Sequence, residues 1–191
     1  TAPKVVMLTG EGVGSGAAGE VWNFFEQQLN YPLTLINAND IGKISLKNYH
    51  VVIMPDGYYR SLSDKNNIDK LKDFVRGGGK LIALEGAASQ LASSDWGFKI
   101  KEDKDKDDKK EDKKEDYANL KKYADREKDY LLNSIPGAIY KVELDNTHPL
   151  AFGYSNTYYT LKQDANIYEF MKDGWNVGVL KKENYVTGFS G

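Results

Sequence analysis

The sequence predicts an α/β fold of the flavodoxin-like type, in which two layers of helices cover a mostly parallel sheet. Two observations support this. Short runs rich in Val, Ile and Leu alternate with helical patterns through residues 4–86, and such runs are typical of parallel strands buried on both faces. After residue 137 the strand patterns follow one another, with Asp-Asn and Asp-Gly turns among them. They predict antiparallel strands that join the same sheet.

The first half of the chain is predicted to contain strands at residues 4–10, 33–38, 50–56 and 80–86. Helices are expected at residues 19–29 and 63–76. The first helix has an apolar stripe formed by Val21, Phe24, Phe25 and Leu29. The second ends at Gly77-Gly78-Gly79, since glycine readily adopts the backbone conformation that terminates a helix.

The second half is predicted to begin with a helix and to continue as strands. Apolar residues at Tyr117, Leu120, Tyr123 and Leu131 suggest a helix that stops before Pro136. Strands are expected at residues 138–144, 157–162, 166–170 and 176–180.

The length of 191 residues and the hydrophobic content of 40% predict one domain over residues 1–191. Residues 101–116 are all charged, and a segment without apolar side chains has nothing to bury. We interpret it as an insertion, either a solvated loop or a frayed helix; the alternative is a segment that docks a protein or binds a cation. The chain starts at Thr1-Ala2-Pro3-Lys4 without Met or a signal peptide, so we expect a segment excised from a larger polypeptide.

Composition argues against several classes of function. A net charge of −2 provides no basic field for nucleic acid or anionic lipid. The absence of Cys excludes disulfides and thiolate chemistry, and the presence of only two histidines, His50 and His148, argues against an imidazole-rich metal site. No apolar run reaches the roughly 18 residues of a membrane span. We therefore expect no metal ligands, no nucleic acid partner and no membrane span in this segment; the oligomeric state stays open.

A glycine-rich segment at residues 10–20 is the first candidate site. It contains Gly14-x-Gly16-x-x-Gly19 before a helix whose free N–H groups could hold an anion or another polar ligand. The segment departs from a dinucleotide fingerprint because Gly14 lies four residues beyond Gly10, and the second strand ends in Asn37 where a ribose-binding acid belongs. The alternative is a flexible loop before a helix. Candidate ligand-binding residues here are Glu11, Gly14, Ser15 and Gly16.

The strand-to-helix turn at residues 83–89 is the second candidate site. Hydrolytic α/β folds place a nucleophile on such an elbow, but Glu85 stands at the apex, and Ser89 lies outside any G-x-S-x-G pattern. A carboxylate there could act as base or nucleophile only with a partner or a desolvated pocket. The alternative is an inert elbow. Asp56, Gly57, Glu85 and Gly86 are candidate ligand-binding residues, because they converge at the carboxyl edge of this kind of sheet.

Residues 145–150 include His148 before Pro149, which is typical of a structural turn. A metal site there would need carboxylate ligands, and no HExxH motif is present. We assign no metal ligand to this segment.

The order of the segments KVVMLTG, YHVVIMPDG and GGGKLIALEGAAS resembles the class I glutamine amidotransferase-like superfamily. In that superfamily a Pro-Gly-Gly turn supplies oxyanion-hole N–H groups, and Pro55-Asp56-Gly57 matches two of its three positions. The resemblance places Glu85 where the superfamily has a catalytic Cys. Its distal His-Pro-Glu has at best a counterpart in His148-Pro149-Leu150. The resemblance therefore implies the fold without the catalytic triad, and no catalytic residue is assigned.

A second resemblance covers nearly the whole chain. The segments TGEGVGSGAAGEVWNFFEQQLNYPLTLINA, MPDGYY and IPGAIYKVELDNTHPLAFGY are similar to the C-terminal region of large bacterial zinc carboxypeptidase-related proteins. In those metallopeptidases a preceding hydrolase domain holds zinc through His-x-x-Glu and a distant His. The resemblance implies that zinc and proteolysis belong to a peptidase domain outside this chain, and that the protein is extracytoplasmic, either periplasmic or secreted. This segment itself is expected to bind no cofactor.

The sequence-based hypothesis is a non-catalytic accessory domain of a secreted zinc carboxypeptidase, with the peptidase domain of the same polypeptide as its partner. Two alternatives stay open. One is a domain that binds a small molecule or anion through the glycine-rich loop and the carboxyl edge of the sheet. The other is a hydrolase that uses Glu85.

Overall fold

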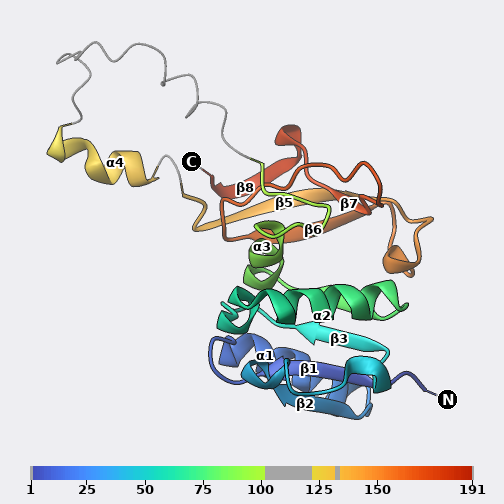
Figure 1. Cartoon of the computed structure of the whole chain (residues 1–191). Coiled ribbons are helices and arrows are strands. Elements are labelled where there is room, and N and C mark those ends of the chain that lie inside the picture. Colours follow the sequence, from blue (N-terminus) through green and yellow to red (C-terminus); the bar gives the residue numbers. More distant parts are fainter. Residues whose placement is uncertain (1, 102–121, 132–133, 191) are drawn as a thin grey trace. The chain divides into compact units, whose positions relative to one another are not determined.

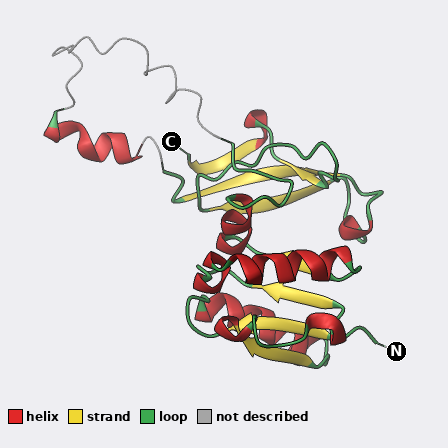
Figure 2. Ribbon diagram, in the orientation of Figure 1, coloured by secondary structure: helices red, strands yellow, loops and turns green. Residues whose placement is uncertain are grey.

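The computed structural model describes residues 2–101, 122–131 and 134–190. Its backbone divides into two compact units, Thr1–Trp96 and Gly97–Gly191, and each is described by itself (Figures 1 and 2). The interpretation of residues 1–191 as one domain stays a prediction. Apart from Lys101, the charged run at residues 101–116 lies outside the described residues, as do Tyr117 and Leu120.

The first unit contains a four-stranded parallel sheet, which confirms the predicted α/β class. Its strands are β1 (Val5–Thr9), β2 (Leu33–Asn37), β3 (Val51–Met54) and β4 (Lys80–Ala83), in the order β2-β1-β3-β4. The register pairs Val5 with Leu33 on one side and with Val51 on the other. All four strands lie within the ranges predicted for them, because each belongs to a mostly apolar segment that is followed by polar residues or glycine.

Three α-helices accompany this sheet: α1 (Ser15–Asn23), α2 (Lys65–Arg76) and α3 (Gly86–Ala92). The chain runs outward from β1 to β2 through α1, and in the opposite direction from β3 to β4 through α2. Because crossovers between parallel strands are right-handed, the two helices cover opposite faces of the sheet. The crossovers that follow β1 and β3 therefore run in opposite directions along the sheet. The carboxyl ends of these two strands mark the point where ligands bind in many folds of this type.

The core of the first unit consists of alternate strand residues. Val5, Met7 and Ile53 are buried on the face where Ala18, Val21 and Phe25 of the first helical segment pack. Val6, Leu8, Val52 and Met54 are fully or almost fully buried and face the other side by strand alternation. Leu71 is the fully buried residue of α2.

The helix predicted at residues 19–29 differs from the structure at both ends. It begins at Ser15, and the segment Phe24–Gln28 is a π-helix. Val21 and Phe25 pack on the core, but Phe24 and Leu29 are about half exposed. The wider π-turn rotates the following side chains away from the stripe that a regular period of 3.6 residues predicts. The second helix agrees with its prediction: Asp64 caps it by accepting from the Asn66 N–H, and it ends at Gly77.

The second unit contains an antiparallel sheet built on β5 (Gly137–Leu144). Strand β6 (Thr157–Lys162) pairs along one edge of β5, and both β7 (Gly178–Val179) and β8 (Tyr185–Phe189) pair with β5 as well. These strands form their own sheet, so the expectation that they join the parallel sheet is wrong. The strands predicted at residues 138–144 and 157–162 are confirmed.

Two other predictions for this unit fail. Residues 166–170 form no strand, and Tyr168 makes an isolated bridge with Ile100. The strand predicted at residues 176–180 is reduced to two residues, while β8 was not predicted. A bulge between Ile139 and Tyr140 shifts the register against β8, and Gly188 of β8 has a positive φ of 108°. Because β8 is irregular in this way, its sequence lacks the regular alternation of apolar and polar residues by which a strand is predicted.

A short helix, α4 (Arg126–Leu131), follows a 3₁₀ turn and stands where a helix was expected. Within the described ranges, 3₁₀ segments occur at Ala38–Asp40, Leu46–Asn48, Arg60–Ser63, Tyr123–Asp125, Pro149–Ala151 and Lys182–Asn184. In the part of the chain that the structure describes, no helix has both the length and the apolar character needed to cross a bilayer.

Candidate functional site

The loops that follow β1 and β3 are joined by backbone hydrogen bonds at the carboxyl edge of the parallel sheet. Gly14 N–H donates to the Asp56 carbonyl (2.8 Å), and Tyr58 N–H donates to the Gly12 carbonyl (2.7 Å). The approach is close enough that a Cβ on Gly12 would lie 2.3 Å from the Tyr58 carbonyl oxygen. Two backbone hydrogen bonds therefore join the glycine-rich segment to the turn after β3.

The turn between β4 and α3 is a sharp elbow with Glu85 at its apex. Glu85 has φ 46° and ψ −114°, a combination that side-chain-bearing residues rarely adopt. The Ser89 N–H donates to the Glu85 carbonyl at 3.0 Å. The Glu85 side chain is exposed, and within the described residues its carboxylate has no hydrogen-bond or ion-pair partner. The strained backbone is that of a nucleophile elbow, but the exposed carboxylate is bonded to no other side chain among the described residues.

The residue after the apex donates its backbone N–H to a carboxylate of the same unit. Gly86 N–H donates to Asp56 Oδ1 at 2.9 Å, and this contact is partly buried. A Cβ on Gly86 would lie 2.6 Å from Asp56 Oδ1 and 2.9 Å from the Gly57 carbonyl oxygen. The absence of a side chain at residue 86 therefore lets the turn after β3 sit directly against the start of α3.

Two further residues fix this arrangement. Gln90 Oε1 accepts from the Tyr59 N–H, and Gln90 Nε2 donates to the Tyr59 carbonyl, each at 2.8 Å. The buried Tyr59 hydroxyl donates to the Pro55 carbonyl at 2.7 Å. Burial, and to a lesser degree the negative charge of Asp56, raises the pKa of Tyr59 well above its usual value. Neither Gln90 nor Tyr59 was predicted as a site residue. The sequence signal for Gln90 is its position one turn after Gly86, on the same face of α3.

The residues predicted as ligand-binding are partly brought together. Gly14, Asp56, Gly57 and Gly86 are in mutual contact through Asp56, and Glu85 adjoins Gly86 in sequence. Glu11 lies in the same loop region, but its exposed carboxylate pairs with Arg60 Nη1 at 3.1 Å. Ser15 and Gly16 begin α1 and are exposed, and Gly14 at the cap provides no side-chain hydrogen bond. Ligand binding by these residues stays a prediction.

Both histidines have structural partners. His50 Nδ1 accepts from the Lys4 N–H (2.8 Å), and His148 Nδ1 accepts from the Leu150 N–H (3.2 Å). The His148 ring also lies 6.0 Å from the Trp175 ring, centroid to centroid. Across the described ranges, His, Asp and Glu side chains nowhere gather in a group of three or more that could hold a metal ion.

The chemistry of this site differs from that of a hydrolytic elbow. Acyl transfer needs N–H donors directed at the position where an oxyanion develops, and in α/β-hydrolase elbows the N–H of the residue after the nucleophile is one of them. Here that N–H belongs to Gly86 and already binds the Asp56 carboxylate. An oxyanion at this position would have to displace a bound carboxylate and would meet its negative charge.

Solved structures with a similar fold match nearly the whole chain. A glutamine amidotransferase from Thermotoga maritima matches with a TM-score of 0.57 at 10% sequence identity, covering 96% of this chain and 68% of that chain. A protein described as a GMP synthase subunit from Thermoplasma acidophilum matches with a TM-score of 0.53 at 7% identity, covering 91% and 70% of the two chains. The protein SMU.1228c matches with a TM-score of 0.54 at 8% identity, covering 93% and 68%.

No family model and no curated protein matches the sequence. The parallel sheet, the antiparallel strands that follow it and these structural neighbours together show that the chain has an α/β, flavodoxin-like fold of the class I glutamine amidotransferase-like type.

Proposed function

We infer that this chain is a non-catalytic accessory domain that uses an amidotransferase-like fold as a scaffold. Its proposed context is a secreted zinc carboxypeptidase-related polypeptide, with zinc and peptide hydrolysis assigned to a peptidase domain elsewhere in that polypeptide. The sequence segments at residues 9–38, 54–59 and 135–154, which are similar to the C-terminal regions of such proteins, support this context.

The single observation that carries the non-catalytic assignment is the hydrogen bond from Gly86 N–H to Asp56 Oδ1. Removing one oxyanion donor from an acyl-transfer enzyme lowers kcat by about 10²–10³. In this chain the donor is present but is used to bind a carboxylate, so it makes a structural contact between the turn after β3 and α3. The energy of that contact stabilises the fold and is not available to a transition state.

The position of Glu85 also supports the proposal. A carboxylate acts as a general base or nucleophile when burial or a neighbouring acid adjusts its proton affinity. Glu85 is exposed, and no hydrogen bond or ion pair joins its carboxylate to another side chain in the described part of the chain.

The first experiment uses this chain and its Glu85→Gln variant. Both are assayed for release of ammonia from glutamine, hydrolysis of an activated ester, and release of C-terminal residues from peptides. The proposal predicts rates for the two proteins that are equal to each other and to the background. Hydrolysis by the wild-type chain that Glu85→Gln abolishes would contradict it and would favour the hydrolase alternative.

The second experiment tests the proposed partner in the full natural polypeptide. Carboxypeptidase activity and thermal stability are compared for the wild type, the Glu85→Gln variant and a version that lacks these 191 residues. The proposal predicts that Glu85→Gln changes neither quantity, whereas the deletion lowers the melting temperature of the peptidase or weakens its substrate binding. A peptidase that loses nothing on deletion would contradict the accessory role.

A further inference from the structure

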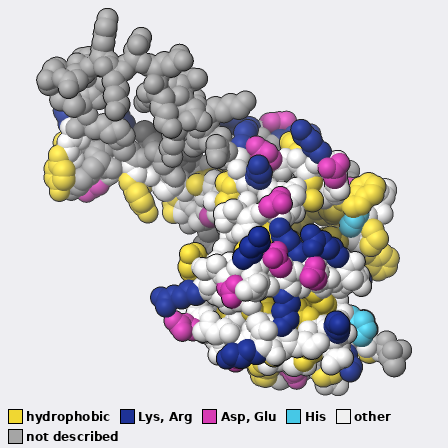
Figure 3. Space-filling model, in the orientation of Figure 1, with side chains coloured by type: hydrophobic (Ala, Val, Ile, Leu, Met, Phe, Trp, Pro, Cys, Tyr) yellow, Lys and Arg dark blue, Asp and Glu magenta, His cyan; other side chains and the backbone are white. Residues whose placement is uncertain are grey.

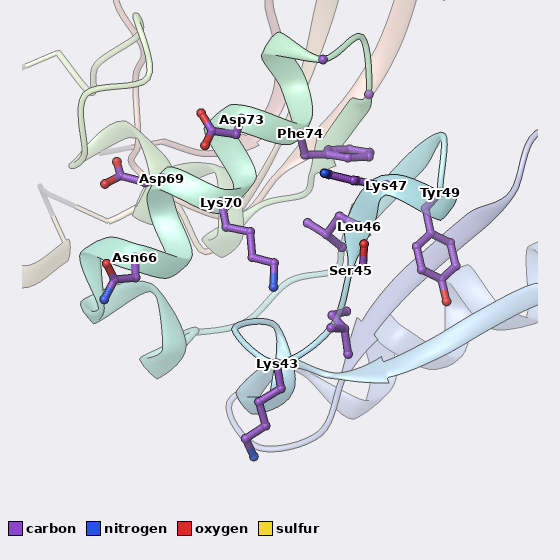
Figure 4. Close-up of a pocket in the computed structure, with 13 residues that line it drawn as sticks. Lys43, Ser45, Leu46, Lys47, Tyr49, Asn66, Asp69, Lys70, Asp73 and Phe74 are labelled. Atoms are coloured by element: carbon purple, nitrogen blue, oxygen red, sulfur yellow. The ribbon is translucent and has the colours of Figure 1, made fainter.

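The first unit has a cleft at the opposite edge of the parallel sheet from the Glu85 elbow. It lies between α2 and the segment 43–49, and Tyr49 and Gly79 line it just before β3 and β4 begin (Figure 4). Its volume of about 780 Å³ is within the range of pockets that bind small molecules. The cleft shares no residue with the predicted ligand-binding set at the carboxyl edge.

The apolar wall of the cleft is fixed by contacts on both sides. Leu46 is buried, and a Cβ on Gly79 would lie 2.4–2.5 Å from the ring carbons of Phe74. The Phe74 ring therefore rests directly on the backbone at residue 79. On the facing side, Lys70 Nζ donates to the Gly42 carbonyl at 2.9 Å, which ties α2 to the loop that leads into segment 43–49. This hydrogen bond joins the two walls of the cleft.

The charge inside the cleft is positive. Figure 4 shows Lys47 and Lys70 directed into the space between α2 and the segment 43–49, alongside Phe74. Within the described residues Lys47 has no hydrogen-bond or ion-pair partner. Lys70 uses one of its three donors on the Gly42 carbonyl and keeps the others.

The acidic residues that border the cleft do not cancel this charge. Asp73 pairs with Arg76 at 3.0 Å, and Asp69 points away from the space between the two walls in Figure 4. The space-filling view shows lysines, arginines and carboxylates gathered over α2, so the outer face of the helix has mixed charge (Figure 3). The lysines that face inward are therefore the charges that an occupant of the cleft would meet.

We propose that this cleft binds a small organic anion in which a carboxylate is attached to an apolar or aromatic body. The carboxylate lies between the Lys47 and Lys70 ammonium groups, and the body packs on Phe74 and Leu46. Charge-assisted hydrogen bonds to the ammonium groups orient the ligand, and burial of its apolar part supplies affinity. The same chemistry is offered by a free aryl or alkyl carboxylic acid and by the C-terminal residue of a peptide.

The test is a titration of the full chain followed by amide NMR shifts at Lys47, Phe74 and Gly79. Three probes are used: 3-phenylpropionate, N-acetyl-glycyl-phenylalanine, and the neutral 3-phenylpropionamide. We expect saturable shifts with at least one of the two acids. The affinity for the amide is expected to be about tenfold weaker. Saturation by the free acid, by the peptide or by both identifies the source of the carboxylate, and each of these results supports the proposal.

Matched variants test the role of the ammonium group. Lys47→Met, which keeps the apolar stem, is expected to weaken binding of the acids by about three- to fivefold, the effect of one partly exposed ion pair. Lys65→Met removes an exposed lysine of α2 outside the cleft and is expected to leave binding unchanged. The proposal is overturned if neither acid gives saturable shifts up to about 10 mM. A dissociation constant above that concentration corresponds to a binding free energy weaker than about 3 kcal/mol. Equal affinity for acid and amide, or a Lys47→Met variant that binds as tightly as the wild type, also overturns it.

Discussion

Replacing Glu85 by Gly is expected to stabilise the first unit, although the change removes the residue at the position of a nucleophile. Glu85 holds φ 46° and ψ −114° at the apex of the elbow. Glycine has no Cβ and adopts positive φ without this penalty. The exposed Glu85 side chain has no partner among the described residues, so the substitution removes backbone strain and loses no side-chain contact.

The size of the effect follows from two opposing contributions. A non-glycine residue in a sparsely populated backbone region carries strain of about 1–3 kcal/mol. Glycine makes the unfolded chain more flexible, which costs about 0.5–1 kcal/mol. The difference is a gain of up to about 2.5 kcal/mol in the free energy of unfolding, centred on about 1 kcal/mol.

Urea unfolding followed by tryptophan fluorescence measures this free energy, because Trp22 and Trp96 lie in the first unit. The matched control is Glu85→Ala, which removes the same side chain but keeps the Cβ; its stability is expected to stay within about 0.5 kcal/mol of the wild type. If Glu85→Gly is less stable than Glu85→Ala, the elbow stores no strain at residue 85 and the reasoning is refuted.

Substitutions at two further positions test the contacts behind the elbow. Asp56→Ala removes a charge-assisted acceptor from the partly buried Gly86 N–H. We expect it to lower the free energy of unfolding by about 1.5–3 kcal/mol, and Asp56→Asn to lower it by less. A loss under about 0.5 kcal/mol for Asp56→Ala would show that the bond is not formed in solution. Tyr59→Phe leaves the buried Pro55 carbonyl without its donor and is expected to cost about 1–2 kcal/mol at neutral pH. Burial and, to a lesser degree, the charge of Asp56 raise the pKa of Tyr59 in the folded state. Above about pH 10 the unfolded state therefore releases a proton that the folded state keeps, and the free energy of unfolding falls as the pH rises. Urea unfolding at neutral and alkaline pH should therefore show a gap between wild type and Tyr59→Phe that narrows in alkali, and a gap that widens would contradict the assignment.

The parallel sheet could be predicted from the sequence because its information is local. Each strand is rich in Val, Ile, Leu or Met, and each of these segments ends near a glycine or a polar residue. The elbow was also predictable, since a strand that ends at Ala83 and continues into Gly86-Ala87-Ala88 has small residues where the backbone turns sharply.

The decisive contact of the site was not predictable in the same way. Asp56 and Gly86 are thirty residues apart, and they meet because β3 and β4 are neighbours in the sheet. The sequence placed both residues at one edge, but the hydrogen bond depends on the turn geometry that Tyr59 and Gln90 fix. The cleft beside Phe74 was not predicted for a similar reason, as its two walls come from separate segments of the chain.

The second unit was predicted less well because strand pairing there depends on contacts between distant residues. The alternating apolar residues at 166–170 resemble a strand, yet in the described part of the chain no strand pairs with them, apart from the bridge between Tyr168 and Ile100. Strand β8 contains Gly188 and pairs across a bulge. Strand propensity reflects such surroundings more than it reflects the backbone itself.

The most direct test of the non-catalytic assignment is the rate at which an activated ester acylates the Glu85→Cys variant, with and without Asp56→Ala. We expect slow acylation when Asp56 is present, and an increase of at least about tenfold when its carboxylate is removed and the Gly86 N–H becomes available to the oxyanion. Equal rates in two folded variants would contradict the assignment, because they would show that Asp56 does not restrict the donor after the elbow.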